Sequence, residues 1–291
     1  MTSRIQIPTI NDEPADFETL FGLWSEIEDE EREWVLDFTH CRFLKQNAVA
    51  FLGGLIRCAE SRGGTISIDE STLPSAIGMN LKQNGFLPHF TNNGSKWRGN
   101  SVPFREDRDQ DHNSICHYLK QNWLGRSWVQ ASQPLQNAIV GAVWELYANA
   151  FEHSQSEIGI FTCGQHYPQL EWLSLTIVDF GVGIPANVRR YSNDMHMLAS
   201  DPLEWALKSG TTTREKGVCG GMGLDVLKAF IKKNQGKLEI YSCEGYALIN
   251  QSVEEYKQSR VSFEGTLANI SLRCNEAYYQ LASECDDALL F

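Results

Sequence analysis

The sequence predicts an α/β protein in which a small α/β unit precedes an α/β sandwich, a mixed sheet with helices on one face. Two patterns lead to this prediction: apolar residues that alternate with polar ones, as in strands, and apolar residues at helical spacing between those strands. The length of 291 residues suits two domains. We expect the small unit over residues 1–90, a linker or crossover over 91–130, the sandwich over 131–275 and a tail over 276–291.

Strands and helices alternate in the small unit. The segment 16–27 places Phe17, Leu20 and Trp24 at helical spacing, whereas 4–10 alternates apolar and polar side chains like a strand. Gly85 is suited to end a helix as its C-terminal cap. The expected strands are 4–10, 34–38 and 65–69, and the expected helices are 16–27, 47–62 and 75–84.

From about residue 90 to 130 the periodicity fades into Asn, Gly, Ser, Arg and Asp, which predicts an irregular connection. The pattern then sharpens, and a helix over 134–153 places Leu135, Ile139 and Val143 on one face for packing against a sheet. A second helix is expected over 224–234, after an irregular stretch. The expected strands are 158–163, 172–179, 237–242, 246–250 and 266–274.

The composition excludes several classes of partner. The net charge is −12, from 37 acidic and 25 basic residues, and no dense block of Lys and Arg occurs, so no nucleic-acid partner is expected. No apolar run approaches the roughly 20 residues that a membrane-spanning helix needs, so no membrane partner is expected either. The eight cysteines are irregularly spaced without a C-x-x-C pair, which indicates reduced thiols. We expect a cytoplasmic protein.

Three motifs point to chemistry, and the first lies on the expected helix 134–153. Glu145 and Asn149 are four residues apart, so they project from nearly the same stripe, and His153 follows one turn later. A carboxylate beside a carboxamide suits a general base next to an oxygen ligand for Mg²⁺. The plainer alternative is a polar helix edge that faces water.

The second motif is D-F-G-V-G-I-P at residues 179–185, directly after an expected strand. Its two glycines let the backbone turn sharply and approach a flat ligand, while Asp179 accepts hydrogen bonds from that ligand. A protein-kinase D-F-G would need upstream V-A-I-K and H-R-D motifs, and the sequence has neither. A dinucleotide fingerprint over 181–186 contains Pro185, and no strand ending in an acid follows about 20 residues later. An ordinary glycine turn is the remaining alternative.

The third motif is G-V-C-G-G-M-G-L at residues 217–224, which opens the expected helix 224–234. Free N–H groups and the helix dipole at such a place suit a phosphate, and the preceding Thr213, Arg214 and Lys216 add hydroxyl and positive charge. The chain has no P-loop, and a plain flexible loop is the alternative. A zinc site at 112–117 is disfavoured, because a fourth ligand is not evident.

In this order and at this spacing, the motifs resemble those of the GHKL superfamily. That superfamily contains gyrase-type topoisomerases, chaperone ATPases, histidine kinases, mismatch-repair ATPases and anti-sigma-factor serine kinases, and it implies the Bergerat ATP-binding fold. The residues that match the N-box, the two glycine boxes and a later G-T pair are Glu145, Asn149, Ala150 and His153; Asp179, Gly181, Gly183 and Pro185; Gly221, Gly223 and Leu224; and Gly265 and Thr266.

The resemblance implies a protein that binds ATP and Mg²⁺. Asp179 would accept the adenine amino group, directly and through a water that Thr266 supports, and Asn149 would hold the Mg²⁺ that bridges the phosphates. Glu145 would orient and deprotonate the nucleophile of phosphoryl transfer. The other implied nucleotide-binding residues are Gly181, Gly183, Thr213, Arg214, Lys216, Gly221, Met222, Gly223 and Leu224.

Within the superfamily, the chain is most similar to the anti-sigma-factor serine kinases. Glu145 with His153 after it, and T-T-T-R-E-K-x-x-x-G-G-M-G-L at 211–224, carry this similarity. A histidine-kinase phosphoacceptor motif is missing upstream. After Arg273 only a short tail follows, which disfavours the gyrase and mismatch-repair branch.

The small unit is similar to a STAS domain, the fold of anti-sigma-factor antagonists. Where those proteins carry D-S-S-G with a phosphorylated serine, this chain has K-Q-N-A at 45–48. We therefore expect a docking fold that holds a partner or the ATP domain, and no phosphoacceptor at this place.

Three functions follow as hypotheses. The first is a Mg-ATP-dependent ATPase or protein serine/threonine kinase in a bacterial-type regulatory or stress and defence circuit. The alternative is an ATP-switched interaction module with little turnover, and the third is a scaffold that has lost nucleotide binding. The expected partners are ATP and an unidentified protein, and the sequence is compatible with a homodimer.

Overall fold

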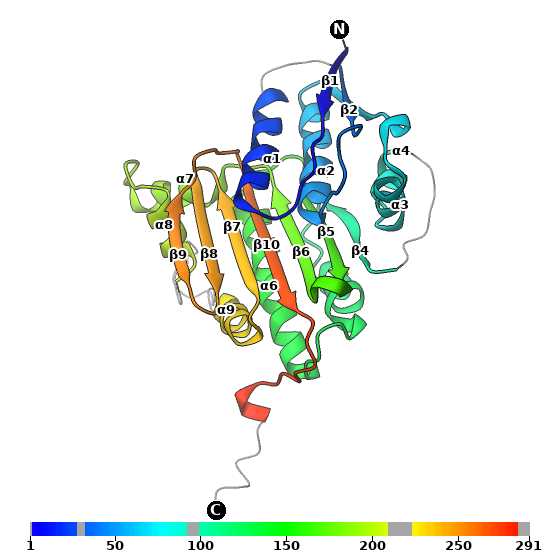
Figure 1. The fold of residues 1–291 in the computed structure, drawn as a ribbon. Coiled ribbons are helices and arrows are strands. Elements are labelled where there is room, and N and C mark those ends of the chain that lie inside the picture. Colours follow the sequence, from blue (N-terminus) through cyan, green and yellow to red (C-terminus); the bar gives the residue numbers. More distant parts are fainter. Residues whose placement is uncertain (1, 28–32, 92–98, 209–222, 285–291) are drawn as a thin grey trace, which may run out of the picture.

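The structure is a computed structural model that describes residues 2–27, 33–91, 99–208 and 223–284 (Figure 1). Its first part has strands β1 (Thr2–Gln6), β2 (Glu33–Asp37) and β3 (Thr65–Ile68), and helices α1 (Pro14–Ile27), α2 (Gln46–Ser61), α3 (Ser75–Gln83) and α4 (Phe86–Thr91). The three strands form a parallel sheet in the order β1-β2-β3. The predicted strands and helices are all present. β1 ends before Pro8, and Ile10 makes only an isolated bridge to Leu44.

The second part contains a seven-stranded sheet. Its strands are β4 (Ser101–Asp107), β5 (Ile160–Tyr167), β6 (Trp172–Asp179), β7 (Lys237–Ser242), β8 (Gly245–Asn250), β9 (Glu254–Gln258) and β10 (Thr266–Arg273). The order across the sheet is β4-β5-β6-β10-β7-β8-β9, and every neighbouring pair is antiparallel. The prediction of a mixed sheet was wrong, because short connections such as β5–β6 and β7–β8 form hairpins, which reverse the chain direction.

The helices of the second part are α5 (His112–Tyr118), α6 (Gln133–His153), α7 (Gly183–Ser192), α8 (Ser200–Ala206) and α9 (Gly223–Asn234). The stretch after residue 179 was predicted to be irregular, but it contains α7 and α8. Both helices make few turns, so their apolar residues give little periodic pattern. Among the described residues, no helix is long and apolar enough to span a membrane.

Helices cover both faces of the seven-stranded sheet (Figure 1). On one face, α6 and α9 pack over Leu175, Leu238 and Ile270. On the other face, α1 and α2 share a core with Phe161 and Val178 of the strands. The helices predicted for the second part, α6 and α9, lie on one face as expected. The small unit covers the other face and adds a second helical layer that was not predicted.

The region 91–130, predicted as an irregular linker or crossover, is regular over most of its described part. β4 pairs with β5 at the edge of the sheet, and α5 is followed by a π-helical turn, Leu119–Trp123. A register shift between Val102 and Arg105 interrupts β4, and the guanidinium of Arg105 bonds the carboxylate of Asp107. The bulge and this charged pair remove the apolar alternation, which explains the error.

A buried polar network joins the first turn of α2 to the seven-stranded sheet. Gln46 is 2% exposed, and its Nε2 donates to Thr176 Oγ1 at 3.3 Å and to Asn269 Oδ1 at 3.2 Å. The hydroxyl of Tyr167 donates to Gln46 Oε1 at 2.8 Å. Gln46 of the K-Q-N-A segment at 45–48 is therefore bound to the sheet.

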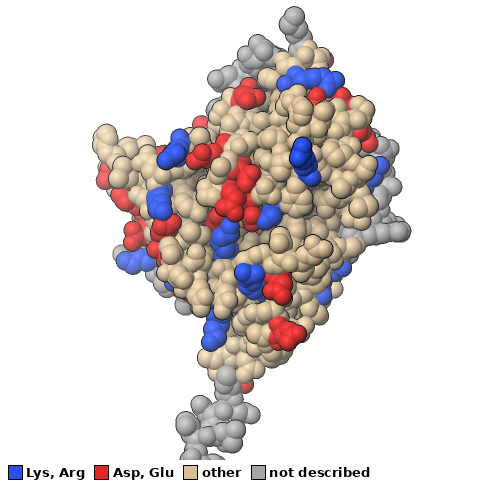
Figure 2. Space-filling model, in the orientation of Figure 1, with Lys and Arg blue, Asp and Glu red and all other residues tan. Residues whose placement is uncertain are grey.

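On the face shown in Figure 2, Lys and Arg side chains are scattered among Asp and Glu side chains. Ion pairs of the structure include Lys232 with Glu254 and Lys237 with Glu239. The face drawn in Figure 2 thus carries charges of both signs.

Gln46→Ala is expected to lower the free energy of unfolding by about 2 kcal/mol, because the buried groups that bond its amide lose their partner. Urea unfolding at pH 7 measures the change. The exposed Gln133→Ala is the control and should change stability by less than about 0.5 kcal/mol. Equal effects of the two substitutions would show that the network does not stabilise the fold.

Candidate functional site

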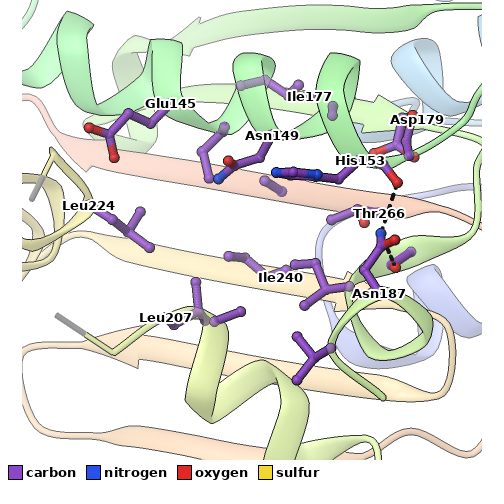
Figure 3. Close-up of a pocket in the computed structure, with 18 of the residues that line it drawn as sticks. Glu145, Asn149, His153, Ile177, Asp179, Asn187, Leu207, Leu224, Ile240 and Thr266 are labelled. Atoms are coloured by element: carbon purple, nitrogen blue, oxygen red, sulfur yellow. Dashed lines mark hydrogen bonds between the residues drawn. The ribbon is translucent and has the colours of Figure 1, made fainter. Parts of the chain in front are cut away.

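A pocket lies between α6 and the ends of α8 and α9, over strands β6, β7 and β10 (Figure 3). Its floor is largely apolar and includes Ile177, Ile240 and Ala268, one from each of these strands. Six of the residues to which the resemblance assigns a catalytic or nucleotide-binding role line this pocket: Glu145, Asn149, Asp179, Gly183, Leu224 and Thr266. The pocket thus gathers residues from segments that are far apart in the sequence.

One wall of the pocket is a polar row on α6. The helix begins after Ser132, whose Oγ accepts a hydrogen bond from the N–H of Leu135 at 3.2 Å. Glu145, Asn149 and His153 follow at steps of four residues, and Figure 3 shows them along the side of the helix that borders the pocket. Asn149 is exposed, whereas Glu145 and His153 are half-buried.

Asp179 ends β6 at the inner end of the pocket and is 3% exposed. The backbone N–H groups of Gly181 and Thr266 donate hydrogen bonds to its carboxylate, but among the described residues Oδ1 has no hydrogen-bond partner. Burial raises the pKa of Asp179 to about 7, although those two hydrogen bonds lower it. A residue that lines the pocket therefore holds a buried acceptor oxygen without a partner in the described part of the chain.

The turn after β6 requires glycine at two places. A Cβ on Gly181 would lie 2.1 Å from the carbonyl oxygen of Ser154, so this turn packs directly on the end of α6. Gly183 has a φ of +74°, and a Cβ there would lie 2.5 Å from Cys243 Sγ. Gly183 lines the pocket. Gly181 does not line it, but its lack of a side chain lets the turn lie close to the backbone of Ser154.

Two side chains hold the first turn of α7 in place. Ser242 Oγ accepts from the N–H of Ile184 at 2.8 Å and lies 2.9 Å from Thr266 Oγ1. Asn187 Nδ2 donates to the carbonyl oxygens of His153 at 2.8 Å and Gly183 at 3.0 Å (Figure 3). Together they tie α7 to β7, β10 and α6.

Asn187 and Ser242 belong to the site but were not predicted from the sequence. Asn187 stands four residues after Gly183, a spacing that gains meaning only when 183–192 is known to be a helix. Ser242 ends a correctly predicted strand, but its role depends on the register that sets it beside Thr266. No local motif marks that register.

The wall opposite α6 comes from the end of α8 and the start of α9. Trp205, Leu207 and Lys208 line it together with Leu224, and Figure 3 shows Leu207 and Leu224 across the pocket from α6. Gly223 is the first residue of α9. The remaining selected residues lie outside the described part of the chain: Thr213, Arg214, Lys216, Gly221 and Met222.

The disfavoured zinc site gains no support from the fold. Cys116 Sγ lies 3.5 Å from His112 Nε2 on α5. Within the described ranges, however, no three His, Cys, Asp or Glu side chains are grouped as metal ligands.

The pocket has two chemically different ends. Its inner end combines an apolar floor with an acceptor oxygen that has no partner, which suits a flat ring that carries an amino group. Its outer end carries Glu145 and Asn149, which suit a proton acceptor and a hard cation, and Lys208 elsewhere in the lining adds positive charge for an anionic group (Figure 3). A scan against protein-family models finds no match to this chain, and a search of curated proteins finds none either.

Asp179→Asn is expected to stabilise the fold at pH 8 by at most about 4 kcal/mol. The folded-state pKa, about 7, lies above the ordinary value of 3.8, so the charged carboxylate opposes folding. This cost is absent below about pH 4, grows as the pH rises, and is complete above about pH 7. An asparagine oxygen can keep both backbone hydrogen bonds and carries no charge.

Denaturant unfolding of both proteins at pH 5 and pH 8 measures this effect. The exposed Asp109→Asn controls for the loss of one negative charge. The gain from Asp179→Asn should be larger at pH 8 than at pH 5, and an equal gain at both values would contradict the raised pKa.

Proposed function

We propose that this chain is a GHKL-type protein that binds ATP with Mg²⁺ and transfers the γ-phosphoryl group to water or to a serine or threonine hydroxyl of a protein. The observation that carries the proposal is Asp179 Oδ1, a buried oxygen that has no partner within the described ranges and belongs to a residue lining the same pocket as Glu145, Asn149 and Thr266. Buried polar atoms normally have hydrogen-bond partners, so an orphan in a pocket points to a ligand that supplies one.

The inner end of the pocket fits adenine. Asp179 Oδ1 would accept from the exocyclic amino group, and Ile240 and Ala268 would contact the ring through apolar surface. Guanine has a carbonyl oxygen at the corresponding position, which would face the carboxylate unfavourably. Thr266 Oγ1 lies 2.9 Å from Ser242 Oγ, in a place to support a water between the ring and the protein.

The outer end fits the phosphates. Asn149 is exposed on α6 and offers an amide oxygen, and Mg²⁺ on a nucleotide needs only one or two protein ligands. When bound, the ion would neutralise negative charge on the phosphates. Glu145, one turn earlier, would take the proton of the attacking water or hydroxyl, and Lys208 would add positive charge. The proposed phosphate contacts at 213–222 lie outside the described residues.

The small unit would serve as a docking fold of the STAS type in a regulatory or defence circuit. A second candidate function, an ATP-switched interaction module with little turnover, is favoured by one contact. Phe180 follows Asp179 directly, and its ring packs against α2 of the small unit. If a ligand in the pocket bound more tightly to one arrangement of Phe180 and α2 than to another, its binding would also move the small unit.

Glu145→Gln is expected to keep ATP affinity within about threefold and to lower ATP turnover at least about 100-fold, because a general base contributes that much to the rate. Calorimetry with Mg-ATP measures binding, and phosphate release, with and without candidate protein substrates, measures turnover. Glu152→Gln on the same helix is the matched control, since Glu152 does not line the pocket. Equal ATP turnover in wild type and Glu145→Gln would contradict the enzymatic role in which Glu145 is the general base.

ATP affinity is expected to fall as the pH decreases below about 7. The adenine amino group donates a hydrogen bond, so ATP binds the charged form of Asp179 and lowers its pKa from about 7. Affinity should therefore be constant above about pH 7.5 and fall by up to about tenfold per pH unit below it. Calorimetry from pH 5.5 to 8.5 tests this, and Asp179→Asn should bind weakly with a flat profile. A pH-independent wild type would contradict the contact to Asp179.

A further inference from the structure

Two consecutive glycines in the middle of α2 each face an aromatic ring from the second part of the chain. Gly53 and Gly54 are buried within a 16-residue helix, where glycine is disfavoured relative to alanine. A Cβ on Gly54 would lie 2.0 Å from Cε2 of Phe180, and a Cβ on Gly53 would lie 2.5 Å from Cε2 of Phe104. The glycines therefore let both rings lie directly against the helix backbone.

The ring of Phe180 is enclosed by aromatic side chains of both parts of the chain. Its centroid lies 5.1 Å from that of Phe51 on α2, 6.2 Å from Phe161 on β5 and 5.8 Å from Phe263. The ring of Phe263 in turn stacks on Phe21 of α1, with centroids 4.6 Å apart. The small unit thus supplies one side of the cluster that surrounds Phe180.

This aromatic cluster contacts both backbone segments that hold the Asp179 carboxylate. Phe180 precedes Gly181, whose N–H bonds that carboxylate. Gly265 precedes Thr266, whose N–H is the second donor, and a Cβ on Gly265 would lie 2.6 Å from the ring of Phe263. The positions of both donors therefore depend on rings that pack against α1 and α2.

We propose that the small unit positions the Asp179 carboxylate for the base of the nucleotide, and that Gly54 and Phe180 are the positioning residues. The inference rests on the function proposed above. In this arrangement α1 and α2 cover one face of the seven-stranded sheet and help to recognise the base in the pocket on the opposite face. They do so in addition to any docking of a partner.

The test compares ATP with inosine triphosphate, which has a carbonyl oxygen in place of the 6-amino group. Calorimetry at pH 8 gives the affinity of each nucleotide for wild type, Gly54→Ala and Gly53→Ala. Gly53→Ala is a matched control, because it places a comparable clash on the same helix but against Phe104 on β4, and β4 contributes no described residue to the pocket.

Wild type should prefer ATP by about tenfold or more, the value of one hydrogen bond to a carboxylate. Gly54→Ala should lower ATP affinity by about that factor and leave the affinity for inosine triphosphate nearly unchanged, because only the contact to Asp179 is displaced. Gly53→Ala should keep the wild-type preference even where it lowers stability. A general weakening of the fold would reduce the affinity for both nucleotides alike.

The outcomes separate this inference from the proposed function. A wild-type preference for ATP that Gly54→Ala retains would overturn the inference and leave the proposed function intact. Wild type that binds neither nucleotide would overturn both. If Gly54→Ala does not fold, Phe180→Leu takes its place, since it removes the enclosed ring and leaves α2 unchanged. Loss of the ATP preference in that variant supports the inference, and a preserved preference overturns it.

Discussion

The carboxyl group of Asp179 is buried, has one oxygen without a hydrogen-bond partner in the part of the chain that the structure describes, and therefore opposes folding at neutral pH. The surrounding structure keeps it in place in spite of this cost. Antiparallel register sets Thr266 opposite it, the tight turn at Gly181 brings a second N–H, and aromatic packing holds both segments. Such a costly group is a common sign that a site is shaped for a ligand and not for stability.

The two faces of the seven-stranded sheet are covered by different parts of the chain. One face carries α6, α9 and the pocket, and the other is buried under α1 and α2 through an apolar core and the Gln46 network. Without the small unit, Phe161, Val178 and Leu267 would be exposed together on the sheet. The chain therefore has two sheets but depends on contacts between them, and the order of its segments does not reveal that dependence.

Local patterns predicted much of the fold and part of the candidate site. The strands 172–179 and 237–242 agree with the structure residue for residue, since alternation and flanking turn residues define them. Asn149 was predicted as a site residue from helical spacing, and Asp179 from its place at the end of a strand. The fold brings both into one pocket. Strand direction, the second helical layer and the role of Asn187 were not predictable, because each depends on partners distant in the sequence.

The most direct test of the central claim is a crystal structure of the chain with Mg²⁺ and a non-hydrolysable ATP analogue. The adenine amino nitrogen is expected at about 3 Å from Asp179 Oδ1, within hydrogen-bond distance. The phosphates are expected at the end of the pocket where Glu145 and Asn149 lie. Adenine bound elsewhere, or an Asp179 carboxylate that the ring does not contact, would contradict the central claim.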